Sequence, residues 1–444
     1  MYVAKVMLNH IVEDLHNHIL CERKSFIKLL LRYIPELVSI GCDGGAESKG
    51  KLFSLKIANL ILAQHEYRNG YLKLLSNPFF MVLDPSNACQ LHCHGCIHSK
   101  TVSDMKWWNN NILDIETAKV VMDRYAPYSF GISLYNWGEP FLNKNVYHII
   151  KYARGFCTNV SLSSNVSVPI DADALVQSGL TFMICSIDGA TQNVYEQYRR
   201  GGRLEQVKEN IIAIRKAKDK YNTTNPMVVW QFLTFEHNIH ELELAKSLAE
   251  EWGADNFLIA NPFSVQWDDS SIKEIRTEQA GFHSFKNNDY MRRRISEMDL
   301  TWENVNKESV EKEFVKFTKR LENFDLSKYP DQKSPVYCNW LYSSIVVDAC
   351  GVFFPCCSMF DDSVVEKATL GKVNLASIDE IDIYNSPAYQ DVRLNKIWFS
   401  GCENCGSRRN VIFNTAHIAK IMKQSNIYHI LTPESIEKLT DWSV

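Results

Sequence analysis

The strand–helix alternation between about Phe79 and Pro262 constrains the fold of this chain more than any other feature of the sequence. Short apolar runs of strand length are separated by stretches that carry apolar residues at helical spacing. Such alternation predicts a parallel sheet with right-handed crossover helices. The runs are Phe79–Leu83, Phe130–Leu134, Asn159–Ser163, Thr181–Ile187, Val228–Leu233 and Asn256–Ile259, with helices such as Ile115–Tyr125, Val146–Arg154, Leu204–Lys218 and Leu242–Trp252. Six units are fewer than the eight that close a TIM barrel, so we expect an open α/β architecture.

The regions on either side of this segment show different sequence patterns. Residues 1–78 form a helical N-terminal extension with helical spacing in Phe26–Tyr33 and Leu55–Tyr67, which we interpret as a cap or a partner-binding region. Residues 264–335 are charged and mostly helical, typical of a solvated connector, with a substrate lid as the alternative. These patterns predict an α/β domain over 79–263, a second cysteine-containing domain over 336–412 and a helical tail over 413–444.

Bulk properties limit the classes of partner. The net charge of −4 gives no electrostatic reason to expect a nucleic-acid partner. The segment Met1–Leu20 lacks the continuous apolar stretch of a signal peptide, and no run has the length of a membrane span. The 13 cysteines in such a chain indicate metal ligation in a reducing compartment rather than disulfides. We therefore expect a cytoplasmic protein with no membrane and no nucleic acid among its partners.

Three cysteines follow the first apolar run in one short loop. Cys89, Cys93 and Cys96 are separated by three and two residues, so the loop can direct three thiolates at one point. Iron–sulfur clusters normally use four cysteine ligands, and a triad leaves one iron open to another ligand. Zinc is the alternative, because His92, His94 and His98 lie in the same loop.

The spacing Cys-x3-Cys-x2-Cys after an apolar strand resembles the signature of the radical S-adenosylmethionine (SAM) superfamily. The resemblance implies a partial (β/α)6 TIM-like barrel and a [4Fe-4S] cluster whose open iron binds SAM. It further implies reductive cleavage of SAM to a 5′-deoxyadenosyl radical that takes a hydrogen atom from the substrate. A reducing partner such as flavodoxin or ferredoxin is implied as well. This chain departs from the family at Gly95, where an aromatic residue is usual.

Motifs after the second and third strands resemble the family's SAM-binding positions. In the run Tyr135–Pro140, the residues Gly138, Glu139 and Pro140 match a Gly-Gly-Glu-Pro-like motif, with Trp137 in place of the first glycine. The resemblance implies that the backbone and the Glu139 carboxylate hold the amino group of SAM. After the third strand, Ser164 and Asn165 take positions that present polar groups to the SAM ribose or carboxylate.

Further candidates for SAM binding follow the fourth strand. Alternation places Ser186 and Asp188 on one face of the strand, and Cys185 on the other face, against helices. The run Tyr198–Gly202 resembles an arginine–glycine stretch of the family, in which an arginine pairs with the SAM carboxylate. Arg199 and Arg200 both fit this role, and surface charge is the alternative for either one.

A second cysteine set lies near the C-terminus. Cys338, Gly351 and Cys356 give Cys-x12-Gly-x4-Cys, with a hairpin predicted from Ser344–Val347 and Val352–Phe354, and Cys402 with Cys405 completes the ligands. This set resembles the start of the SPASM iron–sulfur domain. No cysteine follows Cys405, which is typical of the shorter twitch variant that holds one auxiliary [4Fe-4S] cluster. Four thiolates also suit structural zinc.

The resemblance implies a radical SAM enzyme of the dehydrogenase or epimerase type. An auxiliary cluster suits oxidation of a small polar, sugar- or cyclitol-like substrate, with Glu236 or His237 as the base. Epimerisation would need a hydrogen-atom donor such as Cys357. Peptide maturation and a non-enzymatic zinc-binding protein are the remaining alternatives.

Overall fold

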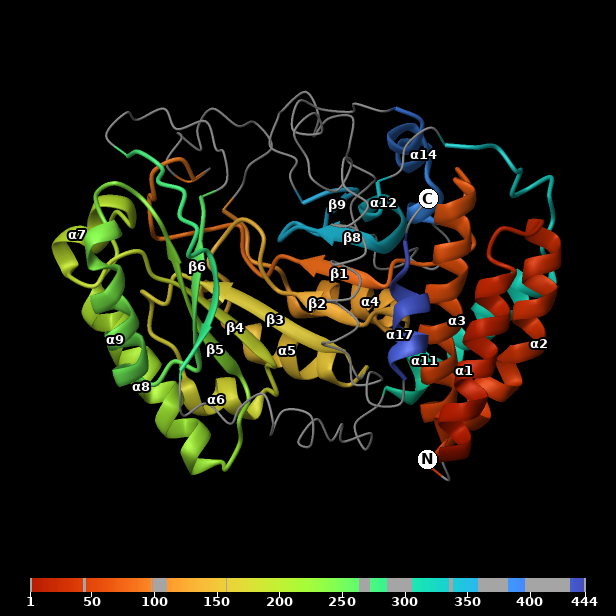
Figure 1. The fold of residues 1–444 in the computed structure, drawn as a ribbon, viewed down its shortest axis with the longest axis horizontal. Coiled ribbons are helices and arrows are strands. Elements are labelled where there is room, and N and C mark those ends of the chain that lie inside the picture. Colours follow the sequence, from red (N-terminus) through yellow and green to blue (C-terminus); the bar gives the residue numbers. More distant parts are fainter. Residues whose placement is uncertain are drawn as a thin grey trace.

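The computed structural model describes residues 2–42, 45–96, 98, 110–156, 158–262, 272–285, 306–334, 338–357, 382–395 and 432–442. One twisted sheet runs through the molecule in the order β7-β6-β5-β4-β3-β2-β1-β8-β9 (Figure 1). The strands are β1 (Phe80–Leu83), β2 (Gly131–Ser133), β3 (Asn159–Ser164), β4 (Phe182–Ser186), β5 (Met227–Leu233), β6 (Asn256–Ala260), β7 (Gly281–Ser284), β8 (Ser344–Val347) and β9 (Phe353–Phe354). All neighbours from β1 to β6 are parallel, which confirms the predicted α/β sheet.

The two ends of the sheet were not predicted in full. At one end, β7 pairs antiparallel with β6. At the other, β8 pairs parallel with β1 and antiparallel with β9, so the predicted hairpin exists and extends the same sheet. The parallel pairing of β8 leaves β1 as an interior strand between β2 and β8. The loop that follows β1 therefore has a neighbouring loop on each side.

Crossover helices connect the parallel strands. They are α4 (Ile115–Tyr125), α5 (Val146–Arg154), α6 (Ala172–Gln177), α7 (Gln192–Tyr198), α8 (Leu204–Lys220) and α9 (Leu242–Trp252). Asp114 starts α4 by accepting from the backbone N–H groups of Glu116 and Thr117. Gly253 ends α9 in the left-handed conformation that suits a helix C-terminus. The bounds of α4, α5 and α9 are those predicted from their apolar spacing.

The two faces of the sheet bury different groups. The helix-covered face packs into the main core, which includes Leu162 and Cys185. The opposite face carries smaller apolar clusters, one around Met227 and Val229 and one around Val82 and Val346. Cys185 is fully buried, whereas Ser186 beside it is partly exposed on the other face. The alternation predicted for this strand is confirmed.

The N-terminal helices belong to the core. They are α1 (Tyr2–Asn17), α2 (Arg23–Cys42) and α3 (Glu47–Asn69), and every residue of α3 from Leu52 to Tyr67 is buried. Figure 1 shows α3 between α2 and the sheet. Buried polar groups on α3 have partners, among them Glu66, which pairs with Arg23 at 2.5 Å. The predicted cap is helical as expected, and α3 is an interior helix of the molecule.

The remaining described helices lie on the same side of the molecule as α3. They are α11 (Lys307–Glu322), α12 (Trp340–Ser343), α14 (Pro387–Leu394) and α17 (Pro433–Thr440). Helices α11, α12 and α17 all contact α3. On α14, the buried Arg393 donates to the carbonyl oxygens of Leu72, Leu341 and Tyr384. Within the described part of the chain, no helix has both the length and the apolar character needed to cross a bilayer.

Candidate active site

The cysteine loop begins where β1 ends. Its three cysteines, Cys89, Cys93 and Cys96, pack into one small cluster with apolar residues from three other segments. The buried members of that cluster are Leu91, Cys93, Tyr198, Phe235 and Ile272. The structure therefore brings the three predicted thiols into one environment at the carboxyl end of the parallel sheet.

The charge of these thiols depends on a positive partner. Burial raises the pKa of Cys89 to about 12 and that of Cys93 to about 11, so the bare groups are protonated at neutral pH. Thiolates at such positions are stabilised by a bound metal centre. Among the described residues, no three Cys, His, Asp or Glu side chains converge at metal-ligand distance. The three thiols are nevertheless the kind of ligand that iron–sulfur clusters use, and they would hold such a cluster once they move within ligand distance of it.

Backbone hydrogen bonds hold the loop against the segment after α7. The N–H of His92 donates to the carbonyl of Arg200 at 3.1 Å, and the N–H of His94 donates to the carbonyl of Tyr198 at 3.3 Å. Gly95 adopts a φ of 68°, in the left-handed region that side chains with a Cβ adopt at a cost. This conformation gives a physical reason for glycine where the family usually has an aromatic residue.

The Gly-Glu-Pro motif lies directly on the cysteine loop. A Cβ atom at Gly138 would lie 2.0 Å from the Ser86 oxygen and 2.6 Å from the Ala88 oxygen, so only glycine fits. The next residue, Glu139, donates its N–H to the Ala88 carbonyl at 2.8 Å. Pro140 begins the short 3-10 helix η3 (Pro140–Leu142), which turns the chain away from the site. The motif and the cysteine loop are thus in backbone contact.

Glu139 connects this motif to the end of β3. Its side chain is 1% exposed and accepts from the Ser164 hydroxyl at 2.8 Å and from the Asn165 N–H at 2.9 Å. A third bond comes from the N–H of Phe141 at 3.1 Å. Burial raises the pKa of Glu139 to about 7, and the hydrogen bonds limit that rise. The Glu139 carboxylate therefore brings together residues that were predicted from separate motifs, namely Glu139 itself, Ser164 and Asn165.

Asn165 extends the contact to the cysteines. Its side-chain N–H lies 3.6 Å from the Cys89 sulfur, and its side-chain oxygen accepts from Gln90 at 2.9 Å. Sequence reasoning missed Gln90, although its position beside Cys89 could have marked it. The loop after β3 therefore orients the first cysteine of the triad.

Asp188 and Arg199 form a buried pair beside the second cysteine. The Arg199 Nε donates to the Asp188 Oδ2 at 2.6 Å, and the Arg199 Nη1 lies 3.8 Å from the Cys93 sulfur. The other Asp188 oxygen accepts from the Leu233 N–H at 2.6 Å. Burial raises the pKa of Asp188, and the Arg199 guanidinium opposes that rise. The sequence left Arg199 and Arg200 as equivalent candidates, and the structure separates them.

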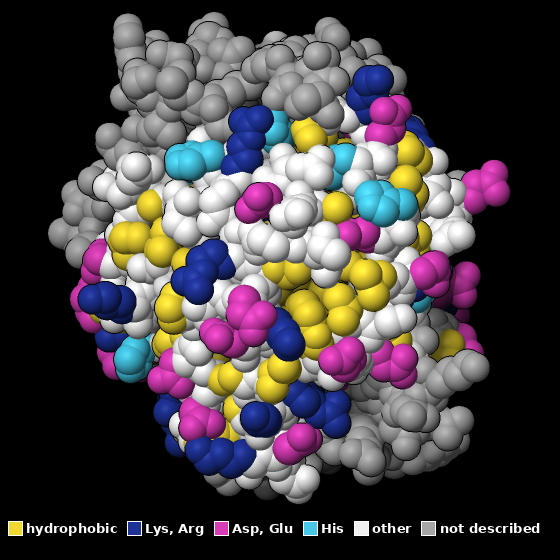
Figure 2. Space-filling view, turned by 90° about the vertical axis from the view of Figure 1, so that its left-hand side faces the viewer, with side chains coloured by type: hydrophobic (Ala, Val, Ile, Leu, Met, Phe, Trp, Pro, Cys, Tyr) yellow, Lys and Arg dark blue, Asp and Glu magenta, His cyan; other side chains and the backbone are white. Residues whose placement is uncertain are grey.

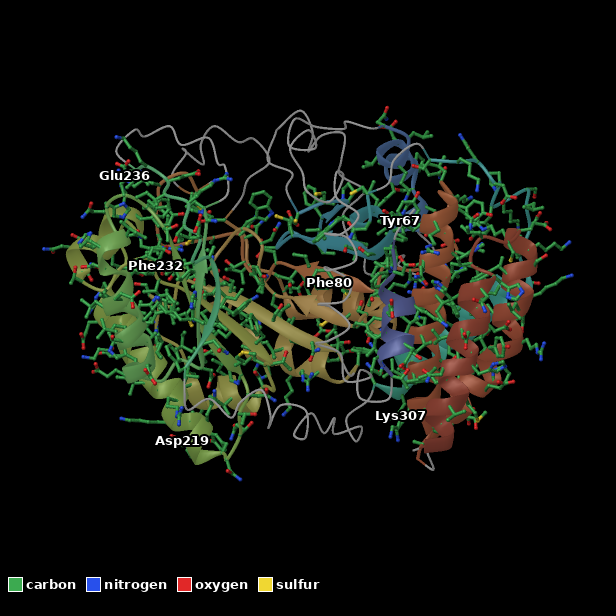
Figure 3. All side chains as sticks on the ribbon, viewed as in Figure 1. Tyr67, Phe80, Asp219, Phe232, Glu236 and Lys307 are labelled. Carbon is green, nitrogen blue, oxygen red and sulfur yellow. The ribbon has the colours of Figure 1, made fainter. Side chains whose placement is uncertain are left out.

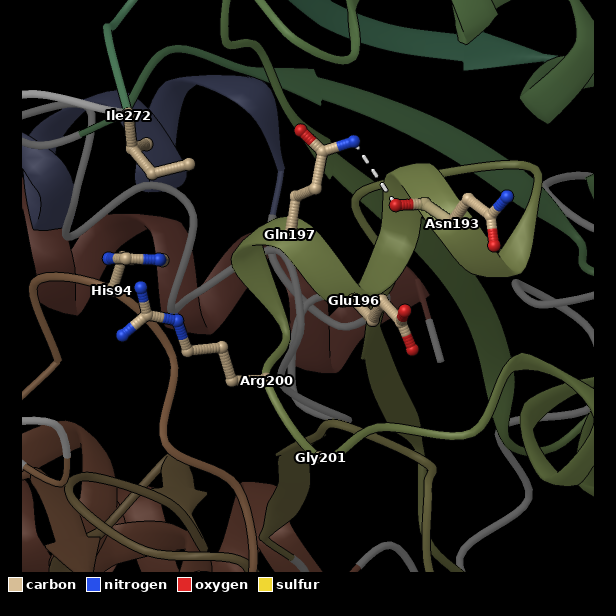
Figure 4. A pocket seen from close by; sticks show the side chains of 7 residues that line it. All are labelled: His94, Asn193, Glu196, Gln197, Arg200, Gly201 and Ile272. Atoms are coloured by element: carbon tan, nitrogen blue, oxygen red, sulfur yellow. Dashed lines mark hydrogen bonds between the residues drawn. The ribbon is translucent and has the colours of Figure 1, made fainter.

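Arg200 lines a hollow on the outside of the cysteine loop. The hollow has a volume of about 450 Å³ and lies between α7 and the loop (Figure 4). In Figure 4 the side chains of His94 and Arg200 lie next to each other. The lining residues are His94, Asn193, Glu196, Gln197, Arg200, Gly201 and Ile272. This polar hollow borders the cysteine loop at His94.

Hydroxyl groups line the face of the sheet that the helices do not cover. Ser133 and Ser161 lie 2.9 Å apart across β2 and β3, and Ser163 lies 3.5 Å from Ser186 across β3 and β4. Tyr135 continues the β2 alternation. Its hydroxyl is hydrogen-bonded by Ser133, and burial together with the nearby Cys357 raises the pKa of Tyr135. Sequence reasoning missed Tyr135, which the two-residue spacing from Ser133 could have revealed.

The two predicted bases differ in their surroundings. Glu236 is more than half exposed, pairs with Lys273 at 3.7 Å and lies at the periphery (Figure 3). His237 is stacked on Phe235 with ring centroids 5.5 Å apart, and Phe235 packs with the cysteines. Neither ring nitrogen of His237 has a hydrogen-bond partner among the described residues. The structure therefore places His237 near the cysteine loop and directs Glu236 to the surface.

The second cysteine set is described in part. Cys338 is buried in the main core, and Cys356 and Cys357 pack against the cluster of Val82, Val346 and Phe354. Because Val82 belongs to β1 and Val346 to β8, this cysteine pair lies on the inner face of the sheet. Cys402 and Cys405 fall outside the described residues.

Two family models match the chain. The model of the radical SAM superfamily matches residues 83–245, and that of the SPASM iron–sulfur cluster-binding domain matches residues 338–406. A curated relative, GTP 3′,8-cyclase of Alkaliphilus metalliredigens (strain QYMF), is 27% identical over 135 residues. That match covers 30% of this chain and 42% of the relative, so the chain spans less than half of the relative's length.

Three solved structures resemble the fold at low identity. Streptococcus suis SuiB bound to S-adenosylmethionine has 13% identity and a TM-score of 0.46, covering 80% of this chain and 76% of its own. Native anSMEcpe with bound AdoMet has 14% identity and a TM-score of 0.43, covering 75% and 88%. BtrN in complex with AdoMet and 2-DOIA has 13% identity and a TM-score of 0.36, covering 75% and 92%.

The two matched regions together contain both cysteine sets and the loops that surround Glu139. The first region carries strands β2 to β5 and the cysteine triad, and the second carries the β8–β9 hairpin with Cys338 and Cys356. On these matches and motifs, the chain contains a radical SAM domain, matched over residues 83–245, and a SPASM-type iron–sulfur region, matched over residues 338–406.

Proposed function

We propose that this chain is a radical SAM oxidoreductase acting on a small polar substrate of the sugar or cyclitol type. In this proposal, Cys89, Cys93 and Cys96 ligate the SAM-binding [4Fe-4S] cluster. The auxiliary [4Fe-4S] cluster takes Cys338, Cys356, Cys402 and Cys405. Bound SAM and its cluster supply the radical that removes a hydrogen atom from the substrate.

The arrangement around Glu139 carries the proposal. Its carboxylate is buried, is oriented by Ser164, Asn165 and Phe141, and lies one loop away from Cys89. A buried carboxylate with a pKa near 7 is held in its charged form when a cation binds beside it. The ammonium group of SAM is such a cation, and Gly138 lets the backbone approach it closely. Arg199 orients the other side of the loop through Asp188 and Cys93.

The row of hydroxyl groups supports a small polar substrate. Ser133, Ser161, Ser163 and Ser186 all lie on the inner face of the sheet, where they can donate and accept hydrogen bonds. Such a surface suits a ligand rich in hydroxyl groups, because buried hydroxyl groups need partners. Tyr135 adds an aromatic surface at the end of the same row.

Epimerisation is the second candidate, and the position of Cys357 favours it. The Cys357 thiol packs on the inner-face cluster and lies within electrostatic reach of Tyr135. A thiol in this position could return a hydrogen atom to a substrate radical. With candidate polyol substrates in deuterium oxide, a dehydrogenase yields a carbonyl product, whereas an epimerase yields an isomer that carries solvent deuterium. Cys357→Ala abolishes only the second outcome.

A reducing partner of the flavodoxin or ferredoxin type completes the proposal. The hollow with His94 and Arg200 abuts the cysteine loop from outside, so an electron donor seated there would approach the cluster closely. The face of the molecule that carries α7 to α9 has acidic and basic side chains interspersed (Figure 2). Arg200 therefore supplies a local positive charge within a mixed surface, and Arg200→Glu should slow reduction without lowering the iron content.

Metal content tests the proposal. Anaerobically reconstituted wild type should hold about eight irons and eight sulfides per chain, and Cys89→Ala/Cys93→Ala/Cys96→Ala about four of each. The triple variant should also form no 5′-deoxyadenosine from SAM. Cys21→Ala serves as the control, because Cys21 lies at the N-terminal helices and should change neither value. Zinc in place of iron, or an unchanged triple variant, contradicts the proposal.

A further inference from the structure

Two carboxyl groups meet where the barrel strand β1 and the hairpin strand β8 end. Leu83 and Val347 are register partners, and the N–H of Asp84 donates to the Val347 carbonyl at 2.8 Å. Asp84 and Asp348 are the next residues on these two strands. Neighbouring strands lie about 4.8 Å apart, so the two side chains are within reach of each other.

Alternation places both carboxyl groups on the inner face of the sheet. Leu83 and Val347 pack into the main core on the helix-covered face, whereas Val82 and Val346 pack on the inner face. Asp84 and Asp348 lie two residues after Val82 and Val346, so their side chains are on the same inner face. Asp84 is 0% exposed and Asp348 is 5% exposed. The pair is therefore enclosed between the cysteine loop and the hairpin that leads to Cys356.

The hydrogen bonds of the pair leave one oxygen atom unexplained. The Asp84 Oδ2 accepts from the Trp137 N–H at 3.0 Å, and the N–H groups of Asn136 and Ser86 also face this side chain. The Asp84 Oδ1 is buried and has no hydrogen-bond partner among the described residues. On the other strand, the Asp348 Oδ1 accepts from the N–H groups of Cys350 and Val352 at 2.9 and 2.8 Å.

The electrostatic surroundings favour a proton on Asp84. Burial, with the negative charge of Asp348 added, raises the pKa of Asp84 to about 8, and the facing N–H groups oppose this rise. The charged group that faces Asp84 across the strands is Asp348, and the other facing groups named above are neutral peptide N–H donors. A protonated Oδ1 would be a donor, which accounts for a buried oxygen that accepts no hydrogen bond from the described residues.

We propose that Asp84 and Asp348 share one proton at neutral pH, with Asp84 as the acid and Asp348 as the carboxylate acceptor. Through Trp137, Asp84 holds the turn that carries Gly138 and Glu139, and Asp348 holds the hairpin turn before Cys356. The shared proton joins these two turns, so Asp84 acts as a positioning residue for both. This inference does not depend on the substrate proposed above.

The sign of the pH dependence follows from the direction of the shift. The pKa of Asp84 in the folded protein lies above the unfolded value of 3.8, so the folded chain retains a proton that the unfolded chain has lost. Stability therefore falls as the pH rises from about 4 towards 8, and this contribution levels off above about 8. Asn at position 84 has no proton to lose, so it should remove this part of the pH dependence.

The test compares thermal unfolding of reconstituted protein at about pH 6 and about pH 8.5. Asp84→Asn keeps an acceptor for Trp137 and a donor for Asp348, and it should reduce the drop in midpoint temperature by about 2–5 °C. Asp114→Asn is the control, because exposed Asp114 also accepts backbone N–H groups, from Glu116 and Thr117, and its lowered pKa keeps it charged at both pH values. The control should show the same decrease in midpoint temperature between the two pH values as wild type. An equal drop in Asp84→Asn and wild type overturns the proposal.

A second measurement needs only a folded wild type. Infrared spectra in deuterium oxide should show a buried carboxylic-acid band that loses intensity in a step near pH 8, separate from the step near pH 7 at which the buried Glu139 ionises. Asp348→Asn removes the neighbouring charge, so the midpoint of this band should move to lower pH. Absence of the band at pH 6 and 7 in wild type overturns the proposal whether or not the variants fold.

Discussion

Arg199 and Asp188 form an ion pair beneath the cysteine loop, with 2.6 Å between the Arg199 Nε and the Asp188 Oδ2. The Asp188 side chain is completely buried and that of Arg199 is 13% exposed. Because a second guanidinium nitrogen lies 3.8 Å from the Cys93 sulfur, the pair links the end of β4 to the middle cysteine. Position and stability of this loop therefore depend on one guanidinium.

Removing the Arg199 side chain should lower the free energy of unfolding. Arg199→Ala leaves the Asp188 charge buried without its cation, and we expect a loss of about 3–5 kcal/mol in the free energy of unfolding. Arg199→Lys should recover only part of this loss, because a single ammonium nitrogen replaces the two guanidinium nitrogens that contact Asp188 and Cys93. Denaturant unfolding measures both values. The exposed pair of Lys220 and Asp173 supplies the control, since Lys220→Ala should change stability little.

Gly138→Ala tests the contact between the Gly-Glu-Pro motif and the cysteine loop. The new methyl group would overlap the carbonyl oxygens of Ser86 and Ala88, so one of the two loops must move. We expect the rate of SAM cleavage to fall by at least about 100-fold, since a misplacement near 1 Å has an effect of that order. Gly131→Ala is the control, because its methyl group would meet only the movable ring of Phe80 at 3.2 Å. Similar rates in the two variants would contradict the assignment.

Glu139→Gln should weaken SAM binding and change its pH dependence. The carboxylate has a pKa of about 7 when no cation is bound, so protonation below pH 7 removes the charge that an ammonium needs. SAM affinity of wild type should therefore drop as the pH falls through about 7, whereas the weaker affinity of Glu139→Gln should stay nearly constant. Calorimetric titration between about pH 6 and 8 distinguishes the two. A wild-type affinity that does not vary with pH would refute the role of Glu139.

Much of the barrel and its site followed from local patterns. Strand and helix positions were predictable because apolar spacing in segments such as α5 and β4 is set by which face is buried. Glu139, Ser164 and Asn165 could be nominated because parallel strands deliver their following loops to the same edge of the sheet. Spacing along the chain gave no information about which side chains bond to each other.

The features that the sequence did not reveal are those made by distant segments. The parallel pairing of β8 with β1 leaves no local signal, because the two strands lie about 260 residues apart. The burial of α3 is completed by α11 and α12, which lie far along the chain, as well as by the neighbouring α2. The difference between Arg199 and Arg200 is likewise set by backbone direction after α7 rather than by residue type. Glu236 and His237 were nominated by position alone, and their side chains point to different surroundings.

The pairing of Arg23 with Glu66 tests how firmly the N-terminal helices belong to the core. Glu66 also accepts from the N–H groups of Leu75 and Ser76, at 2.7 and 3.0 Å, so it fixes the approach to β1. Arg23→Leu should lower the free energy of unfolding by about 3–5 kcal/mol, because it leaves a buried carboxylate without its cation. The double variant Arg23→Leu/Glu66→Leu should be more stable than the single one. A double variant that is less stable than the single one would show that the backbone contacts of Glu66 dominate.

The pairing of β1 with β8 also determines when the protein can mature during synthesis. Residues 80–83 emerge from the ribosome early, and their partner strand emerges about 260 residues later. Until then β1 is an edge strand, and the loop with the three cysteines lacks its neighbour on one side. Long-range pairing of this kind slows folding, because the loop closure between the partners must come first. We therefore expect the cluster at Cys89, Cys93 and Cys96 to be retained stably only after the β8–β9 hairpin has been translated, which makes iron loading a late event in the synthesis of this chain.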